Sequence, residues 1–90
     1  MKVNPNVIHR NVAGEDMLVP TGENALEHNG LFVLTPTGAE MWDYLAEGKN
    51  LDELVAIMSE DYDVEADVIR SDAQALFEKL KNLGLVLDDE

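Results

Sequence analysis

Residues 29–42 read NGLFVLTPTGAEMW and join an apolar strand to the start of a helix. Successive side chains of a strand point to opposite faces, so Leu31 and Val33 share one face while Phe32 and Leu34 share the other. Both faces of this strand are therefore apolar, although a hydrophobic core needs only one of them. We expect the second face to contact a partner.

The residues after this strand contain two competing signals for the start of a helix. Thr35 can act as the N-cap, with Pro36 at the first helical position, where its missing N–H is tolerated. Alternatively, Thr37 and Glu40 have the spacing of a capping box. Either signal predicts a helix that begins near residue 36 and ends at Gly48.

Two more helices are predicted in the second half of the chain. Asn50 and Glu53 form the capping signal of the second helix. The third helix is expected from about Glu65 to Asn82, and Gly84 ends it before the short extended tail LVL. The apolar positions of the first two helices that are expected to lie in the core are Met41, Trp42, Leu45, Leu51, Leu54, Val55 and Met58.

The N-terminal residues are predicted to form a β-hairpin. The segment VIHRNVAG alternates apolar Ile8 and Val12 with polar His9 and Asn11, and the following GED is the predicted turn into a second strand, MLVP. Adding the strand LFVLT gives an α+β fold of winged-helix type. In this fold an N-terminal three-stranded antiparallel sheet is followed by three helices.

The composition limits both the architecture and the partners. The chain has 90 residues, no cysteine and 19 acidic against 6 basic residues, a formal charge of −13. This length suits a single domain, residues 1–90, with one modest core. The negative charge repels phosphate backbones and anionic lipids, so we expect neither nucleic acid nor a membrane as a partner. The absence of cysteine, of a signal peptide and of a long apolar stretch predicts a cytoplasmic location.

No pattern typical of catalysis or metal binding is present. His9 and His28 are the two histidines, and neither has the spacing of a metal site, so both are expected on the surface. An acyl carrier protein is also small and acidic, but Ser59 and Ser71 do not open a helix in the Asp-Ser-Leu context that such a carrier needs. We expect no enzymatic activity, no cofactor and no metal.

The predicted third helix carries two neighbouring stripes of residues at helical spacing. The stripe expected to face the core consists of Ile69, Ala73, Leu76 and Leu80. The adjacent stripe consists of Val68, Asp72, Ala75 and Lys79, in which the small Ala75 leaves room for a ligand side chain. This second stripe is either a ligand-binding face or the border of the core.

A longer pattern extends from the apolar strand to the end of the third helix. It contains a strand, a Thr-Gly-Ala helix start, a helix with a tryptophan, a glycine, an acidic link with a tyrosine, and a third helix before Gly-Leu. The positions that carry it are Leu34, Thr37, Gly38, Ala39, Trp42, Gly48, Leu54, Tyr62, Asp72, Phe77, Leu80, Gly84 and Leu85. From about Val7 to Val86 the chain resembles the PqqD-like peptide chaperones, or RiPP recognition elements. Pro36 and Ala73 depart from the usual residues of that family.

The resemblance implies a binding module for the leader segment of a ribosomally made precursor peptide. In this family the leader adds as an antiparallel strand to the third strand, lies against the third helix and is presented to a modifying enzyme, expected here to be a radical-SAM enzyme. Strand addition supplies backbone hydrogen bonds, while pockets for side chains set specificity. The residues expected to contact the peptide are Leu31, Phe32, Val33, Leu34, Thr35, Val68, Asp72, Ala75, Leu76 and Lys79.

Several alternatives stay open. A winged-helix DNA-binding domain has the same order of elements, but its third helix would present acidic residues to phosphates. A general protein-interaction domain without a leader peptide fits the same composition. The apolar strand could also pair with the same strand of a second copy, and both Phe32 and Leu34 could lie in the core beneath the helices.

Overall fold

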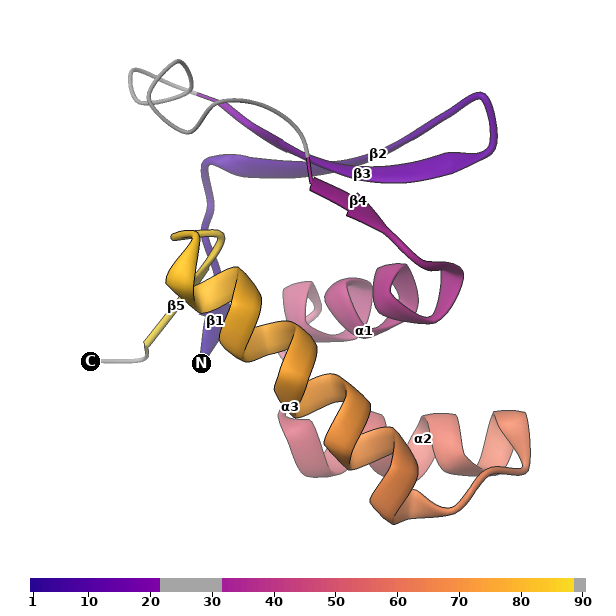
Figure 1. The fold of residues 1–90 in the computed structure, drawn as a ribbon. Coiled ribbons are helices and arrows are strands. Elements are labelled where there is room, and N and C mark those ends of the chain that lie inside the picture. Colours follow the sequence, from indigo (N-terminus) through magenta and orange to yellow (C-terminus); the bar gives the residue numbers. More distant parts are fainter. Residues whose placement is uncertain (22–31, 89–90) are drawn as a thin grey trace.

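The computed structural model describes residues 1–21 and 32–88 and contains a three-stranded sheet next to three helices (Figure 1). Its elements in chain order are β1 (Lys2–Val3), β2 (Val7–Val12), β3 (Glu15–Pro20), β4 (Phe32–Leu34), α1 (Pro36–Ala46), α2 (Leu51–Tyr62), α3 (Ala66–Asn82) and β5 (Val86–Leu87). The main sheet is antiparallel, in the order β2-β3-β4. The predicted fold, a three-stranded antiparallel sheet followed by three helices, is confirmed.

The turn between β2 and β3 differs from the prediction. Ala13 and Gly14 form it, with positive φ angles of 54° and 85°, and the flanking Val12 and Glu15 pair with each other. Two consecutive residues with positive φ are typical of a type I′ hairpin turn, whose twist matches that of the strands. The predicted GED turn is wrong, because Glu15 and Asp16 already belong to β3.

A second, two-stranded sheet joins the two ends of the described chain. β1 pairs antiparallel with β5, which was predicted as an extended tail without a partner. The Asn4 amide supports this junction, since its side chain donates to the Gly84 carbonyl at 2.9 Å and its backbone N–H donates to the Leu85 carbonyl at 3.0 Å. The N-terminal segment is thereby held against the end of α3.

The predicted helix starts agree with the structure, which also decides between the two signals for α1. The Thr35 side chain is the N-cap of α1 and accepts the Gly38 N–H at 3.1 Å. Asn50 and Glu53 form the complete capping box of α2. In residues 1–21 and 32–88, none of the helices has both the length and the apolar character needed to span a bilayer.

The core lies between the sheet and the three helices. Trp42 is buried, as predicted, at 2% exposure. The buried positions of α3 are Ile69, Ala73, Phe77 and Leu80, so the predicted core stripe missed Phe77, while its member Leu76 is half-buried and packs against the core. Leu76 and Phe77 are both apolar but point about 100° apart on a helix, and Phe77 is the one that faces the other helices.

Candidate functional site

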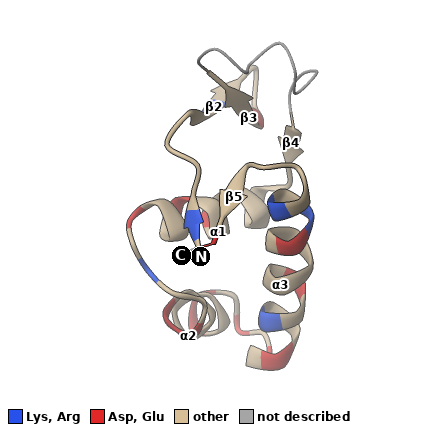
Figure 2. Ribbon diagram, turned by 90° about the vertical axis from the view of Figure 1, so that its left-hand side faces the viewer, with Lys and Arg blue, Asp and Glu red and all other residues tan. Residues whose placement is uncertain are grey.

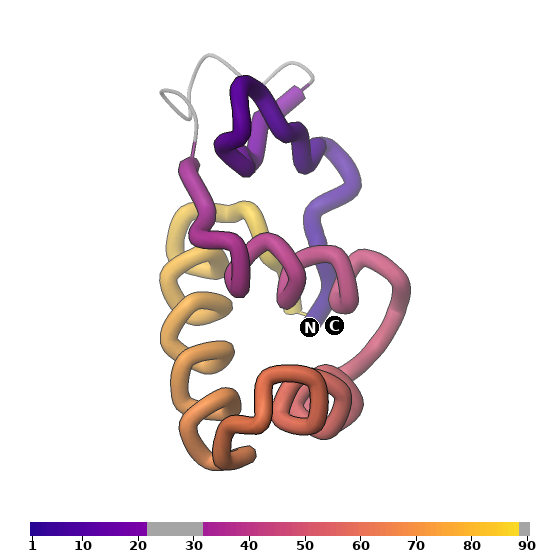
Figure 3. Tube along the Cα trace, turned by 90° about the vertical axis from the view of Figure 1, so that its right-hand side faces the viewer, coloured from indigo at the N-terminus to yellow at the C-terminus, as the bar shows by residue number. Residues whose placement is uncertain are grey.

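β4 is an edge strand of the main sheet. Its three residues pair with residues 16–18 of β3, and no strand pairs with its other side within the two described segments. An edge strand presents unpaired backbone N–H and C=O groups, to which another chain can add. β4 leads directly into α1 and lies next to the C-terminal half of α3 (Figure 3).

The direction of the backbone groups in β3 follows from one hydrogen bond at its end. The Thr21 N–H donates to the Asn6 carbonyl at 2.6 Å, so these two residues extend the β2–β3 ladder with a hydrogen-bonded pair. Hydrogen-bonded and non-bonded pairs alternate along an antiparallel ladder. Met17 is therefore bonded to β2, whereas the N–H and C=O of Leu18 point toward β4.

The same alternation identifies the backbone groups that β4 leaves open. Phe32 is the partner of Leu18 and directs its backbone groups to β3, as does Leu34 two residues later. Val33 lies between them in a non-bonded position and directs both its N–H and its C=O away from β3. Val33 therefore offers one donor and one acceptor to an added strand.

The side chains of β4 divide between the two faces of the sheet as the alternation predicts. Leu34 is buried at 5% exposure and belongs to the core, and Phe32 is half-buried on the same face. Val33 lies on the opposite face and is 57% exposed. The core thus explains one apolar face of β4 and leaves the other uncovered. Leu31 and His28 lie outside the described residues.

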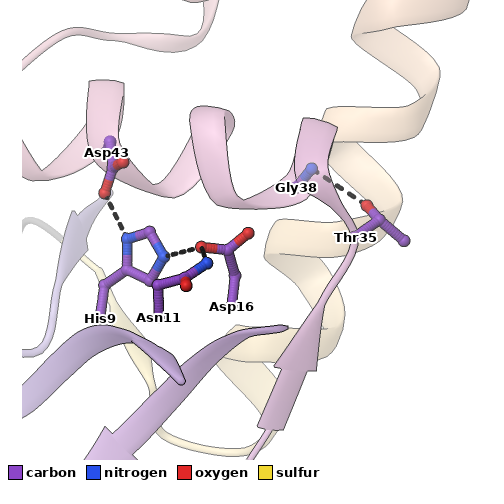
Figure 4. A network of polar contacts seen from close by, with 6 residues as sticks. All are labelled: His9, Asn11, Asp16, Thr35, Gly38 and Asp43. Carbon is purple, nitrogen blue, oxygen red and sulfur yellow. Dashed lines mark hydrogen bonds and ion pairs between the residues drawn. The ribbon is translucent and has the colours of Figure 1, made fainter. Parts of the chain in front are cut away.

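The hydroxyl of Thr35 has a local role. It accepts the Gly38 N–H as the cap of α1, and the pair is drawn in Figure 4. Glu40 does not close a capping box with Thr37; its carboxylate instead accepts hydrogen bonds from the hydroxyls of Tyr44 and Tyr62. The bond from Tyr62 ties α1 to the end of α2, whereas the bond from Tyr44 lies within α1.

The second stripe of α3 is exposed along its length. Val68 is 49% exposed, and Asp72, Ala75 and Lys79 are exposed as well. Leu76 lies beside this stripe and is half-buried. These residues cover a continuous face of α3, because positions three and four apart are neighbours on a helix.

Two contacts bring this face of α3 against β4. Gly38 of α1 lies between the two elements, since a Cβ placed there would be in ordinary van der Waals contact with Leu76 Cδ2 at 3.4 Å and with Leu34 Cδ2 at 3.7 Å. The Lys79 ammonium lies 5.5 Å from the centre of the Phe32 ring, within the range of a cation–π interaction. The structure therefore brings Leu76 and Lys79 next to β4, while Asp72 and Val68 lie farther along α3.

Charge is distributed unevenly between the hairpin and the helices. Residues 1–21 carry two basic and two acidic side chains, whereas residues 32–88 carry thirteen acidic and four basic ones. The acidic residues lie along all three helices (Figure 2). The helical part would therefore attract a positively charged partner at long range.

His9 belongs to a polar contact that the sequence did not predict. Its Nδ1 lies 2.7 Å from Asp43 in α1 and its Nε2 lies 2.9 Å from Asp16 in β3 (Figure 4). Asn11 also donates to Asp16, at 3.2 Å. A carboxylate only accepts hydrogen bonds, so both ring nitrogens can donate together only when His9 is protonated.

This contact makes His9 a structural residue that ties the hairpin to α1. Burial lowers the pKa of His9, but the hydrogen bonds with Asp43 and Asp16 outweigh burial and raise its pKa above the ordinary 6.5. The hydrogen bond from His9, followed by that from Asn11, lowers the pKa of Asp16. Within residues 1–21 and 32–88 no group of three or more His, Cys, Asp or Glu side chains is arranged to hold a metal ion.

Comparison with known proteins identifies the family. Residues 24–86 match the family described as coenzyme PQQ synthesis protein D (PqqD). This match includes β4, the three helices and the start of β5, which is well over half of the chain. The chain therefore belongs to the PqqD family. No curated protein matches it significantly.

A solved structure has the same fold over its full length. It is that of TbiB1 in complex with the TbiA(beta) leader peptide, with a TM-score of 0.82 and 24% sequence identity. The similarity covers 100% of this chain and 99% of the TbiB1 chain. The arrangement of sheet and helices is thus shared between the two proteins.

Proposed function

We propose that this chain is a peptide-binding domain without catalytic activity. It holds the leader segment of a ribosomally made precursor peptide and presents that peptide to a modifying enzyme, expected to be a radical-SAM enzyme. The leader adds as an antiparallel strand to the open edge of β4 and lies against the exposed face of α3.

The observation that carries this proposal is the open backbone position at Val33 beside an exposed helix face. The N–H and C=O of Val33 can bond to an added strand, and Lys79 and Leu76 border the same edge on α3. Backbone bonds give such a complex its affinity, and the flanking side chains give it specificity. Membership of the PqqD family supports the proposal, as does the shared fold of TbiB1, which was solved with a leader peptide.

The charge of the helices argues against the DNA-binding alternative. α3 carries Asp67, Asp72 and Glu78, and two of its cations already form ion pairs, Arg70 with Asp52 at 2.7 Å and Lys81 with Asp88 at 2.6 Å. A helix that enters a DNA groove needs an excess of basic residues. A homodimer through β4 would use the same edge as the leader and would compete with it.

The test is an NMR titration of ¹⁵N-labelled protein with the leader of a precursor peptide encoded next to the gene for this chain. We expect amide shifts to concentrate at residues 32–35 and 67–81. Duplex DNA serves as the comparison ligand and should cause no shifts. Shifts confined to β2 and β3 would contradict strand addition at β4, and sedimentation of the free protein would detect pairing of two copies.

A further inference from the structure

The relative direction of α3 and β4 is fixed by the contacts between them. Lys79, near the end of α3, lies over Phe32 at the start of β4, whereas Leu76, one turn earlier, lies near Gly38 of α1, as does Leu34 at the end of β4. The two elements therefore run in opposite directions. A peptide strand antiparallel to β4 would run parallel to α3, with its N-terminal part nearer the start of the helix.

The face of α3 that borders this edge carries opposite charges at its two ends. Asp72 and Lys79 are seven residues apart, which places them on nearly the same side of the helix and about 10 Å apart along its axis. Neither forms an ion pair within the described parts of the chain, in contrast to Arg70 and Lys81 of the same helix. As far as residues 1–21 and 32–88 are concerned, both charges are thus available to a peptide.

The position of Lys79 gives the edge of the sheet near the start of β4 a positive charge in a protein of net charge −13. The contact with the Phe32 ring holds the ammonium over the start of β4 without using its N–H donors. A peptide carboxylate that reaches this end would meet the Lys79 ammonium, which has no carboxylate partner in the two described segments. A cation there would be repelled, whereas beside Asp72 it would be attracted.

From this arrangement we infer that the domain selects peptides by their charge order. The bound segment carries a basic residue in its N-terminal part, opposite Asp72, and an acidic residue in its C-terminal part, beside Lys79. A strand advances about 3.4 Å per residue and only alternate side chains share a face, so two charges that both face α3 lie two or four residues apart in the peptide. This inference rests on the proposed function and adds the polarity of the peptide.

The test uses two synthetic twelve-residue peptides of identical composition. Both have the same alternating Val/Thr sequence; one carries Lys four residues before Glu, and the other carries Glu four residues before Lys, so that both charges lie on one face of the strand. Affinities are measured at low salt from the ¹⁵N shifts of the β4 amides. We expect the peptide with Lys first to bind about twofold to thirtyfold more tightly, the range for two exposed charge pairs.

Two charge-exchange variants, both with unchanged net charge, complete the test. The double variant Asp72→Lys/Lys79→Asp should reverse the preference between the peptides. The matched control Asp52→Arg/Arg70→Asp exchanges an ion pair that joins α2 and α3 away from β4, and should keep the wild-type preference.

The outcomes separate this inference from the proposed function. Equal binding of both peptides with shifts at β4 would overturn the charge order and leave strand addition intact. Tighter binding of the peptide with Glu first would also overturn it, because the added strand would then run parallel to β4. No shift at β4 with either peptide would overturn strand addition and the charge order together.

Discussion

The substitution Val33→Pro tests the open edge of β4 directly. Proline removes the Val33 N–H, which points away from β3, so the ladder between β3 and β4 keeps its own hydrogen bonds. The preceding residue, Phe32, must stay extended before a proline, and it already lies in a strand. The Val33 side chain is 57% exposed, so its replacement removes little core packing.

The magnitude follows from the hydrogen bond that is lost. A backbone hydrogen bond contributes about 0.5–1.5 kcal/mol, and an acceptor left unsatisfied in a buried place costs about 1–3 kcal/mol. The peptide carbonyl opposite Val33 would face the proline ring in place of its N–H donor. We therefore expect the leader to bind about fivefold to a hundredfold more weakly, which corresponds to about 1–3 kcal/mol.

The assay is isothermal titration calorimetry with the leader, together with a thermal melt by circular dichroism for each variant. Val33→Thr keeps the N–H and the branched shape and should bind the leader normally. Asn11→Pro is the matched control on the other edge strand, because Asn11 occupies the same non-bonded position on β2. A folded Val33→Pro protein with wild-type affinity would refute strand addition at this position.

Three further predictions concern pH, the hairpin turn and salt. The stability that protonated His9 adds should be fully present below about pH 6.5 and should be lost as the pH rises through the raised pKa of His9 in the folded protein. The melting temperatures of wild type and His9→Gln should therefore converge toward high pH. Ala13→Asn should raise the free energy of unfolding in urea by up to about 1 kcal/mol, because asparagine tolerates a positive φ angle better than alanine does. An unchanged midpoint of urea unfolding would argue against the type I′ turn. Added salt should slow the association of a basic leader, measured by stopped flow, and should leave its dissociation rate nearly constant, because the Debye length contracts to roughly 8 Å at physiological ionic strength. An association rate that does not depend on salt would limit the acidic helices to a role in solubility.

The features that could be predicted from the sequence depend on local chemistry. The N-cap of α1 needs only Thr35 and Pro36, and the capping box of α2 needs only Asn50 and Glu53. Each is a contact between residues within one turn, so its spacing is visible in the sequence. The apolar character of both faces of β4 was likewise visible, and it led to the expectation of a second partner.

The features that were missed depend on partners distant in the chain. β1 and β5 are two-residue strands at opposite ends, and neither has a signal of its own. The choice between Leu76 and Phe77 is made by the helices that pack on α3, and His9 acquires its role from Asp43, 34 residues away. The positive φ of Ala13 is uncommon for that residue type, so the turn signal was placed one residue too late.

Among the described residues the main sheet has two edge strands, and their surroundings are the reason for proposing β4, rather than β2, as the acceptor of a peptide. On β2 the outward backbone positions fall at Val7, His9 and Asn11, and the Val7 N–H already donates to the Asn4 carbonyl at 3.0 Å. A strand added to β2 would gain backbone bonds but would lie beside no face of α3. A strand added to β4 gains the Val33 donor and acceptor together with the side chains of α3 that border that edge. Because specificity in strand addition comes from the side chains beside the edge, β4 can select a peptide sequence, whereas β2 could only bind an extended chain of any sequence.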